Sequence, residues 1–209
     1  MKTYIPLIAL LCSNLILLNS CSISNKSVAK QKPDIENVSN NSLCFLQLND
    51  GTIQQYSSLK LVTGVLITPH LLADNKVIIN SNDIKAYQND KFYAVSPKLL
   101  ITDKTSFVAT ETLPGFAVRI TKGKLNIYSR KFYNGSNTVD EYFLQNGENG
   151  QILAYSPEIM IDLVKDNAKA AEFYNSNLKL SPKAKKLLVT AEIYNNPQLI
   201  SKNQIVINQ

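Results

Sequence analysis

The side chains that could carry out catalysis are few in this chain of 209 residues. The one histidine, His70, follows Thr68-Pro69 and precedes Leu71-Leu72. A hydrolytic triad would have to use this histidine as its base, but the sequence lacks the Gly-x-Ser-x-Gly elbow that presents the nucleophile in a large class of hydrolases. We therefore expect His70 to be a turn residue or a partly buried one.

Carboxylates offer a second route to catalysis, because two of them about 5–10 Å apart can hydrolyse a glycosidic bond. Acidic residues recur along the chain, among them Asp83, Asp90, Asp103, Glu111, Asp140 and Glu141. Their spacing singles out no pair, so we expect them in turns or on the surface. Asp140 and Glu141 are the residues to substitute first in a test for a carboxylate hydrolase.

The sequence also lacks the usual motifs for metals and cofactors. Neither His-Glu-x-x-His nor Cys-x-x-Cys occurs, and no run of residues matches an EF-hand loop. Gly147 and Gly150 belong to a predicted hairpin turn rather than to a phosphate-binding loop. We therefore predict no catalytic set, no metal site, no cofactor and no disulfide. Cys44, beside Leu43 and Phe45, is expected to be buried.

The amino terminus has the parts of an export signal. Lys2 supplies a positive charge, and residues 5–18 form an apolar stretch of about 14 residues. A membrane-spanning helix needs roughly 20 apolar residues, so this stretch is too short to span a bilayer. It ends at Leu18-Asn19-Ser20-Cys21, which resembles the lipobox of bacterial lipoproteins. Asn19 departs from the residues usual at that position of the lipobox.

The resemblance to bacterial lipoproteins implies cleavage before Cys21, a diacylglycerol on its thiol and usually an acyl chain on the new amino terminus. Each buried CH₂ of these chains contributes roughly 0.8 kcal/mol, so several chains hold a protein stably on a membrane. The alternatives are an ordinary signal peptide with a coincidental cysteine and an uncleaved signal anchor. We expect a cell-envelope protein that is lipid-anchored to a bacterial membrane, with the outer membrane favoured.

Four segments follow from this interpretation. Residues 1–20 are the lipoprotein signal peptide and residues 21–42, rich in Ser, Asn and Lys, are a lipidated flexible tether. A tether of about 20 residues has a root-mean-square reach of roughly 25 Å. Residues 43–195 are expected to form one globular domain, and residues 196–209 a tail or a short strand.

The globular part changes its periodicity near residue 156. Before that point, short segments of β type alternate with turn signals, at 43–48, 52–56, 77–80, 84–87, 92–95, 107–111, 116–121, 125–132, 142–145 and 151–155. After it, Ser156-Pro157 and Ser181-Pro182 start two helical patterns, the first with a possible break near Asp166-Asn167. We predict an α+β fold: an antiparallel twisted sheet or small open β-barrel, followed by two or three carboxy-terminal helices that cover its open face.

The order of several segments resembles that of uncharacterised secreted β-rich proteins of Bacteroidetes. In those proteins a segment ending I-K-x-[YF] precedes a K-G-K-L-x-L-Y strand and a Y-[FY]-[LI]-x-[KN]-G strand, and helices close the domain. The corresponding segments here are 81–87, 92–93, 121–128 and 142–145. The resemblance covers roughly residues 43–194. It implies an envelope protein of the same broad type and assigns no catalytic residue.

The charge balance of the chain is modestly basic. Removal of Lys2 with the signal lowers the net charge from +6 to +5. Lys179, Lys183, Lys185 and Lys186 form a cluster that could attract anionic lipid or a wall polymer, but a solvated helix face is the preferred interpretation. Exposed tyrosine rings could stack on sugars, although core positions are more usual. Nucleic acid is not expected as a partner outside the cytoplasm.

These observations favour a non-enzymatic envelope lipoprotein that binds another envelope protein or polymer through a sheet edge or a helix face. The alternative is an envelope hydrolase that uses carboxylates on a wall or surface polysaccharide. A third interpretation is a structural or stress-related surface protein without a discrete ligand.

Overall fold

The computed structural model describes residues 44–103, 111–133, 135–177 and 183–197, apart from the side chain of Phe132. The predicted signal peptide, Cys21 and the tether therefore lie outside the described residues. So do Ser181-Pro182, Lys179, most of the predicted strand 107–111 and most of the predicted tail. No helix in the described ranges is long and apolar enough to cross a membrane.

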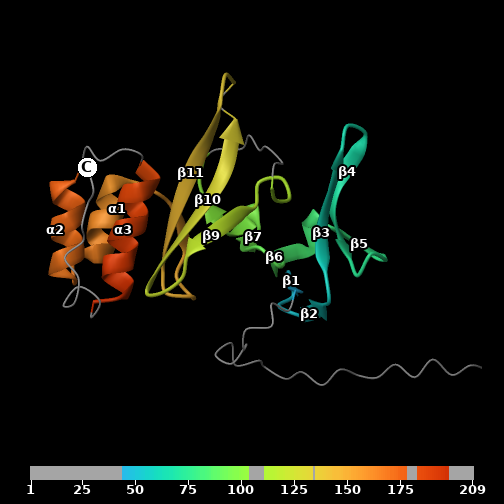
Figure 1. The fold of residues 1–209 in the computed structure, drawn as a ribbon, viewed down its shortest axis with the longest axis horizontal. Helices are drawn as coiled ribbons and strands as arrows, with labels where there is room; N and C mark the ends of the chain where they lie inside the picture. Colours follow the sequence, from blue (N-terminus) through green and yellow to red (C-terminus); the bar gives the residue numbers. More distant parts are fainter. Residues whose placement is uncertain (1–43, 104–110, 134, 178–182, 198–209) are drawn as a thin grey trace, which may run out of the picture. The chain divides into compact units, whose positions relative to one another are not determined.

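Nine strands form one curled, mostly antiparallel sheet (Figure 1), in the order β2-β1-β6-β7-β9-β10-β11-β12-β8. Only the pairing of β12 with β8 is parallel. The strands are β1 (Cys44–Leu48), β2 (Ile53–Tyr56), β6 (Ile84–Gln88), β7 (Tyr93–Val95), β8 (Leu100–Ile101), β9 (Ala117–Thr121), β10 (Leu125–Tyr133), β11 (Thr138–Asn146) and β12 (Ile152–Ala154). Two short 3₁₀ helices, η2 (Ser81–Asp83) and η3 (Pro97–Leu99), precede β6 and β8.

The longest hairpin of the sheet is formed by β10 and β11, which pair in unbroken register from Leu125↔Asn146 to Tyr133↔Thr138. Residues of one strand alternate between the two faces of a sheet. Leu125, Ile127 and Leu144 therefore reach the core on the helical side, while Tyr128 and Phe143 belong to a separate buried cluster. Gly147 has a φ of +63°, a conformation that suits glycine, in the turn after β11.

A second, three-stranded sheet is made of β3 (Leu59–Gly64), β4 (Ile67–Ala73) and β5 (Val77–Asn80). The sequence prediction included only the last of these strands. The β4–β5 turn has no glycine: Asp74 and Asn75 themselves take positive φ, at 49° and 56°. Asp and Asn tolerate this conformation better than most residues do, but a search for Gly-containing turns misses it.

Three helices follow the sheet: α1 (Pro157–Val164), α2 (Ala168–Ser176) and α3 (Lys183–Asn195). The predicted start and break are both present, because the Ser156 side chain accepts a hydrogen bond from Ile159 N and the Asn167 side chain accepts one from Ala170 N. These are N-caps, which satisfy amide groups that have no partner within the helix.

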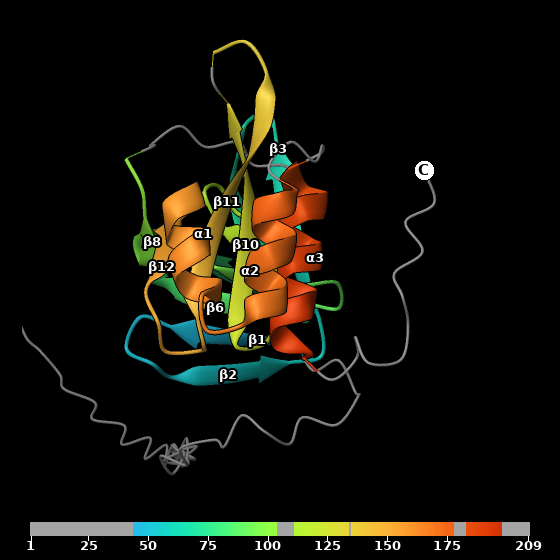
Figure 2. The same cartoon turned by 90° about the vertical axis from the view of Figure 1, so that its left-hand side faces the viewer.

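The core is organised as three clusters. One joins the helices to β10 and β11 through residues such as Met160, Tyr174 and Leu187. A second joins the small sheet to β1 and β6, with Leu71 and Ile84 fully buried. The third lies within the large sheet around Tyr128 and Phe143. The helices and the small sheet thus lie at different parts of the large sheet (Figures 1 and 2), and the predicted α+β class is confirmed.

Candidate functional site

A pocket of about 230 Å³ is lined by residues from β11, from β12 and from the start of α3. Its charged and polar walls are Asp103, Asp140, Glu141, Tyr142, Tyr155 and Lys183. Three of the six carboxylates named from the sequence therefore meet at one place. The sequence could not group them, because Asp103 follows β8 and reaches β11 only through the parallel pairing of β8 with β12.

The two adjacent acids on β11 have different surroundings. Glu141 is buried, and its side chain contacts the Arg130 guanidinium, with an Nη2–Oε2 distance of 2.7 Å. The Thr102 hydroxyl donates a second hydrogen bond to Glu141 Oε1 at 2.9 Å. Asp140 is exposed and forms an ion pair with Lys131 at 2.7 Å. The expectation of a surface position is confirmed for Asp140 and wrong for Glu141, because β11 begins at Thr138 rather than at residue 142.

These bonds bear on what the carboxylates can do chemically. A glycosidase needs one carboxyl group that donates a proton and a second that acts as a nucleophile or a base. The Glu141 carboxylate instead accepts hydrogen bonds from a guanidinium and a hydroxyl group. The Asp140 carboxylate accepts one from Lys131. Both carboxylates therefore already accept hydrogen bonds from side chains of the same chain.

Two of the lining residues, Tyr155 and Lys183, also contact aromatic or cationic side chains. The hydroxyl groups of Tyr155 and Tyr174 are 2.7 Å apart. Lys183 Nζ lies 5.2 Å from the centre of the Tyr155 ring, and Lys186 Nζ lies 3.5 Å from that of Tyr174. Both distances are in the range of cation–π contacts. Desolvation, and next the hydrogen bond with Tyr155, raise the pKa of the Tyr174 hydroxyl.

Lys186 corrects the interpretation of the lysine cluster. Lys183 and Lys185 are exposed, as expected for a solvated face, but Lys186 is only 5 % exposed. Burial removes water from its ammonium group and lowers the pKa of Lys186. A periodicity analysis assigns Lys186 to the polar face because it gives no weight to the Tyr174 ring that covers the ammonium group.

We predict that Lys186→Met raises the free energy of unfolding at pH 7, and that this advantage shrinks as the pH rises toward 10.5. Because the folded-state pKa of Lys186 is lowered, the unfolded chain binds more protons between the folded pKa and the unfolded pKa. The penalty of the buried charge is therefore present at neutral pH and is relieved at higher pH. Urea unfolding at pH 7 and pH 9.5 measures the difference in stability between Lys186→Met and the unaltered chain, with Lys185→Met as the exposed control. An advantage that does not change with pH would contradict the prediction.

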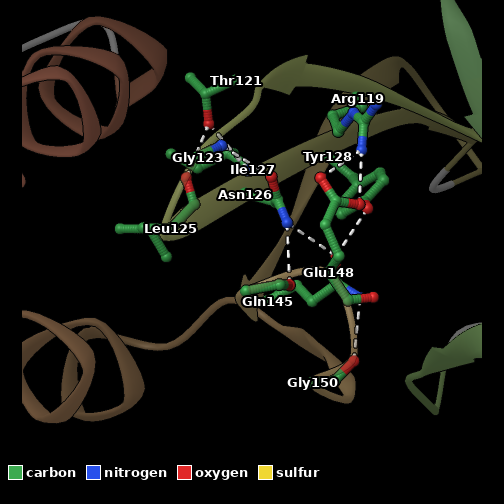
Figure 3. A network of polar contacts seen from close by, with 11 residues as sticks. Arg119, Thr121, Gly123, Leu125, Asn126, Ile127, Tyr128, Gln145, Glu148 and Gly150 are labelled. Carbon is green, nitrogen blue, oxygen red and sulfur yellow. Dashed lines mark hydrogen bonds and ion pairs between the residues drawn. The ribbon is translucent and has the colours of Figure 1, made fainter. Parts of the chain in front are cut away.

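A second polar cluster closes the opposite end of the β10–β11 hairpin (Figure 3). Gln145 Oε1 accepts hydrogen bonds from the Tyr128 hydroxyl at 2.7 Å and from Asn126 Nδ2 at 3.1 Å. Gln145 Nε2 in turn donates to the backbone oxygen of Gly150 at 2.9 Å. Arg119 joins this cluster through an ion pair with Glu148 at 3.0 Å.

Two bonds of this cluster, from Asn126 Nδ2 to the Gly147 oxygen and from Gln145 Nε2 to the Gly150 oxygen, hold the turn that follows β11. Desolvation raises the pKa of Tyr128 to about 12, and Arg119 lies 4.2 Å from the centre of the Tyr93 ring. A signal for this cluster is present in the sequence, although it matches no known motif. Asn126 lies between Leu125 and Ile127, Gln145 follows Leu144, and the two polar residues are direct partners in the register.

The remaining candidate residues stay apart from the pocket. His70 is half-buried on β4, with its Nδ1 2.9 Å from the Thr68 carbonyl oxygen, which confirms a partly buried position. Cys44 is buried at the start of β1, as expected. Asp83 and Asp90 are exposed, and Glu111 lines another pocket of about 230 Å³, which shares Asp140. Within the described ranges, no three His, Cys, Asp or Glu side chains are grouped so that they could hold a metal ion.

Comparison of the whole chain with models of protein families, with curated proteins and with solved structures gave no match.

Proposed function

We propose that this chain is a membrane-anchored cell-envelope lipoprotein that binds an envelope polysaccharide and does not catalyse a reaction. The sequence Leu18-Asn19-Ser20-Cys21, which resembles a lipobox, supports the anchor. The pocket on β11, β12 and α3 supports the binding of a polar polymer, and it is the observation that carries the proposal. Protein ligands of the envelope and a purely structural role are the other outcomes that a binding experiment distinguishes.

The chemistry of the pocket fits a sugar chain. Carboxylates accept hydrogen bonds from sugar hydroxyl groups, and the Lys183 ammonium donates them or pairs with an acidic substituent. The rings of Tyr142 and Tyr155 offer apolar faces next to polar tips. Asp140, Glu141 and Lys183 place charges of both signs at the same opening. A neutral or zwitterionic polysaccharide therefore matches the walls better than a strongly acidic one.

Co-sedimentation of the purified chain with insoluble wall polysaccharide tests this proposal. Lys183→Ala and Asp103→Asn should each weaken binding by about tenfold or more, because a hydrogen bond to a charged group contributes roughly 1.5–3 kcal/mol. Lys165→Ala is the matched control, since Lys165 is a helix lysine that is paired with Asp162 at 2.7 Å, with both side chains 70 % exposed. Equal binding by all four proteins, or no binding by the unaltered chain, would overturn the assignment of the pocket.

The meeting of three carboxylates at one pocket keeps the envelope hydrolase as a second candidate. The same sedimentation samples test it through the release of soluble reducing ends. Release by the unaltered chain that is lost in Asp103→Asn and in Asp140→Asn would establish catalysis and refute the proposal of a binding module.

A further inference from the structure

The tip of the β3–β4 hairpin presents its largest side chains to solvent. The turn residues Val65 and Leu66 are 101 % and 97 % exposed, and Ile67, the first residue of β4, is 48 % exposed. Single apolar residues on a surface are ordinary, but three consecutive ones at a projecting turn are not. Val77 and Ile78 on β5 add further exposed apolar surface to the same sheet, at 50 % and 62 %.

Charge is absent from the outer part of this hairpin. From Leu61 to Ala73 the sequence contains no Asp, Glu, Lys or Arg, although charged residues make up 18 % of the chain. The charges of this sheet lie near its base. Lys60 Nζ donates to Asn75 Oδ1 at 2.9 Å, and the Asp74 carboxylate accepts hydrogen bonds from Ser57 N and Ser58 N. The hairpin tip therefore carries apolar surface without any charge that would have to lose its water.

The base of the same hairpin is held firmly. Leu59, Leu71 and Ala73 are buried against β1 and β6 in one core cluster. Strand β4 pairs on one side with β3 and on the other with β5, with His70 opposite both Val62 and Asn80. The exposed tip is thus the end of a projecting hairpin whose base is packed in the core (Figure 1). Such an element can hold two or three side chains at a fixed place on another surface.

We propose that the tip formed by Val65, Leu66 and Ile67 inserts into the lipid bilayer to which the chain is tethered. The inference rests on the anchor part of the proposed function. The described structure begins at Cys44, and 22 residues separate it from Cys21, which limits how far the domain can lie from the lipid. A bilayer is therefore always within reach of the domain, while a soluble partner has to be met by diffusion. The tip supplements the acyl chains and sets which side of the domain faces the lipid.

The composition of the chain provides a clean probe, because it contains no tryptophan. Leu66→Trp places a single indole at the tip of the full-length lipidated protein. The matched control is Ile161→Trp, which replaces another exposed apolar residue, 41 % exposed, on α1. Both proteins are reconstituted into phosphatidylethanolamine–phosphatidylglycerol vesicles, with and without brominated acyl chains. Mass spectrometry of the amino-terminal peptide reports separately whether Cys21 carries lipid.

We expect the emission of Leu66→Trp to shift to shorter wavelength in vesicles and to be quenched by the brominated chains, while Ile161→Trp does neither. A lipidated chain in which Leu66→Trp remains unquenched would refute insertion and leave the anchor standing. Quenching of both variants would refute a specific role of the tip. A shift that grows with protein concentration in detergent alone would refute lipid as the occupant and point to a second copy of the chain. A bare Cys21 thiol would refute the anchor, and with it the proposal that the tip inserts into the bilayer to which the chain is tethered.

Discussion

Glu141→Ala is expected to lower the free energy of unfolding by about 3–5 kcal/mol, because it removes one partner of a buried ion pair. The Arg130 and Glu141 side chains are 1 % and 5 % exposed, and two nitrogen atoms of the guanidinium lie 2.7 Å from Glu141 Oε2. Arg130 also lies 5.2 Å from the centre of the Phe143 ring, a contact that does not replace a carboxylate. The hydrogen bond from the Thr102 hydroxyl to Glu141 Oε1 would be lost as well.

The adjacent residue on β11 supplies the control. Asp140 also pairs with a cation across the β10–β11 hairpin, but the Asp140 and Lys131 side chains are 38 % and 44 % exposed. Exposed pairs of this kind contribute about 0–1 kcal/mol, so Asp140→Ala should change stability little. Guanidinium chloride unfolding of both variants measures the difference. Two losses of similar size would show that the burial of the Arg130–Glu141 pair does not determine its contribution.

The Arg130–Glu141 pair could not be predicted from the sequence, because it depends on where β11 begins. The sequence predicts two separate strands, at 125–132 and 142–145, and Asn134-Gly135 marks the end of the first segment. The predicted second strand began at residue 142, which left Glu141 in a turn. In the structure the strand extends back to Thr138, and the unbroken register places Glu141 directly opposite Arg130. A difference of four residues in the start of one strand thus decides whether Glu141 is assigned to the surface or to a buried ion pair.

Local signals predicted the helical part of the fold better than the small sheet. Ser156 and Asn167 determine where α1 and α2 begin through hydrogen bonds to residues three positions later, so the sequence alone contains the signal. The pocket depends instead on contacts between distant segments. Asp103 and Lys183 belong to elements eighty positions apart, and only the strand order brings them together. No motif spacing could have grouped these two residues.

A second large loss of stability is expected at another long-range contact, between Gly123 and Asn195. Asn195, the last residue of α3, accepts a hydrogen bond from Leu125 N at 2.8 Å and donates one to the Leu125 carbonyl at 2.9 Å. The Asn195 amide thereby takes the place of a strand partner before β9 and β10 begin to pair. Asn195→Ala should cost about 2 kcal/mol or more, because it leaves a partly buried donor and acceptor unpaired.

Gly123 leaves the space that this amide occupies. A Cβ at Gly123 would lie only 2.6 Å from Asn195 Nδ2 and 2.7 Å from Asn195 Oδ1. The Asn195 side chain cannot move away without breaking both bonds to Leu125. Gly123→Ala is therefore expected to destabilise the protein by about 1–3 kcal/mol, the usual cost of overpacking.

Gly123→Ala should stabilise the protein, rather than destabilise it, when Asn195 is replaced by alanine. Gly123 is not among the residues with positive φ, so alanine can adopt its backbone conformation. With the clash removed, Gly123→Ala in the Asn195→Ala background should stabilise by about 0.4–1 kcal/mol through the lower entropy of the unfolded chain. A double-mutant cycle from urea unfolding gives the coupling directly. If Gly123→Ala costs the same in both backgrounds, then the end of α3 does not constrain the β9–β10 turn through this amide.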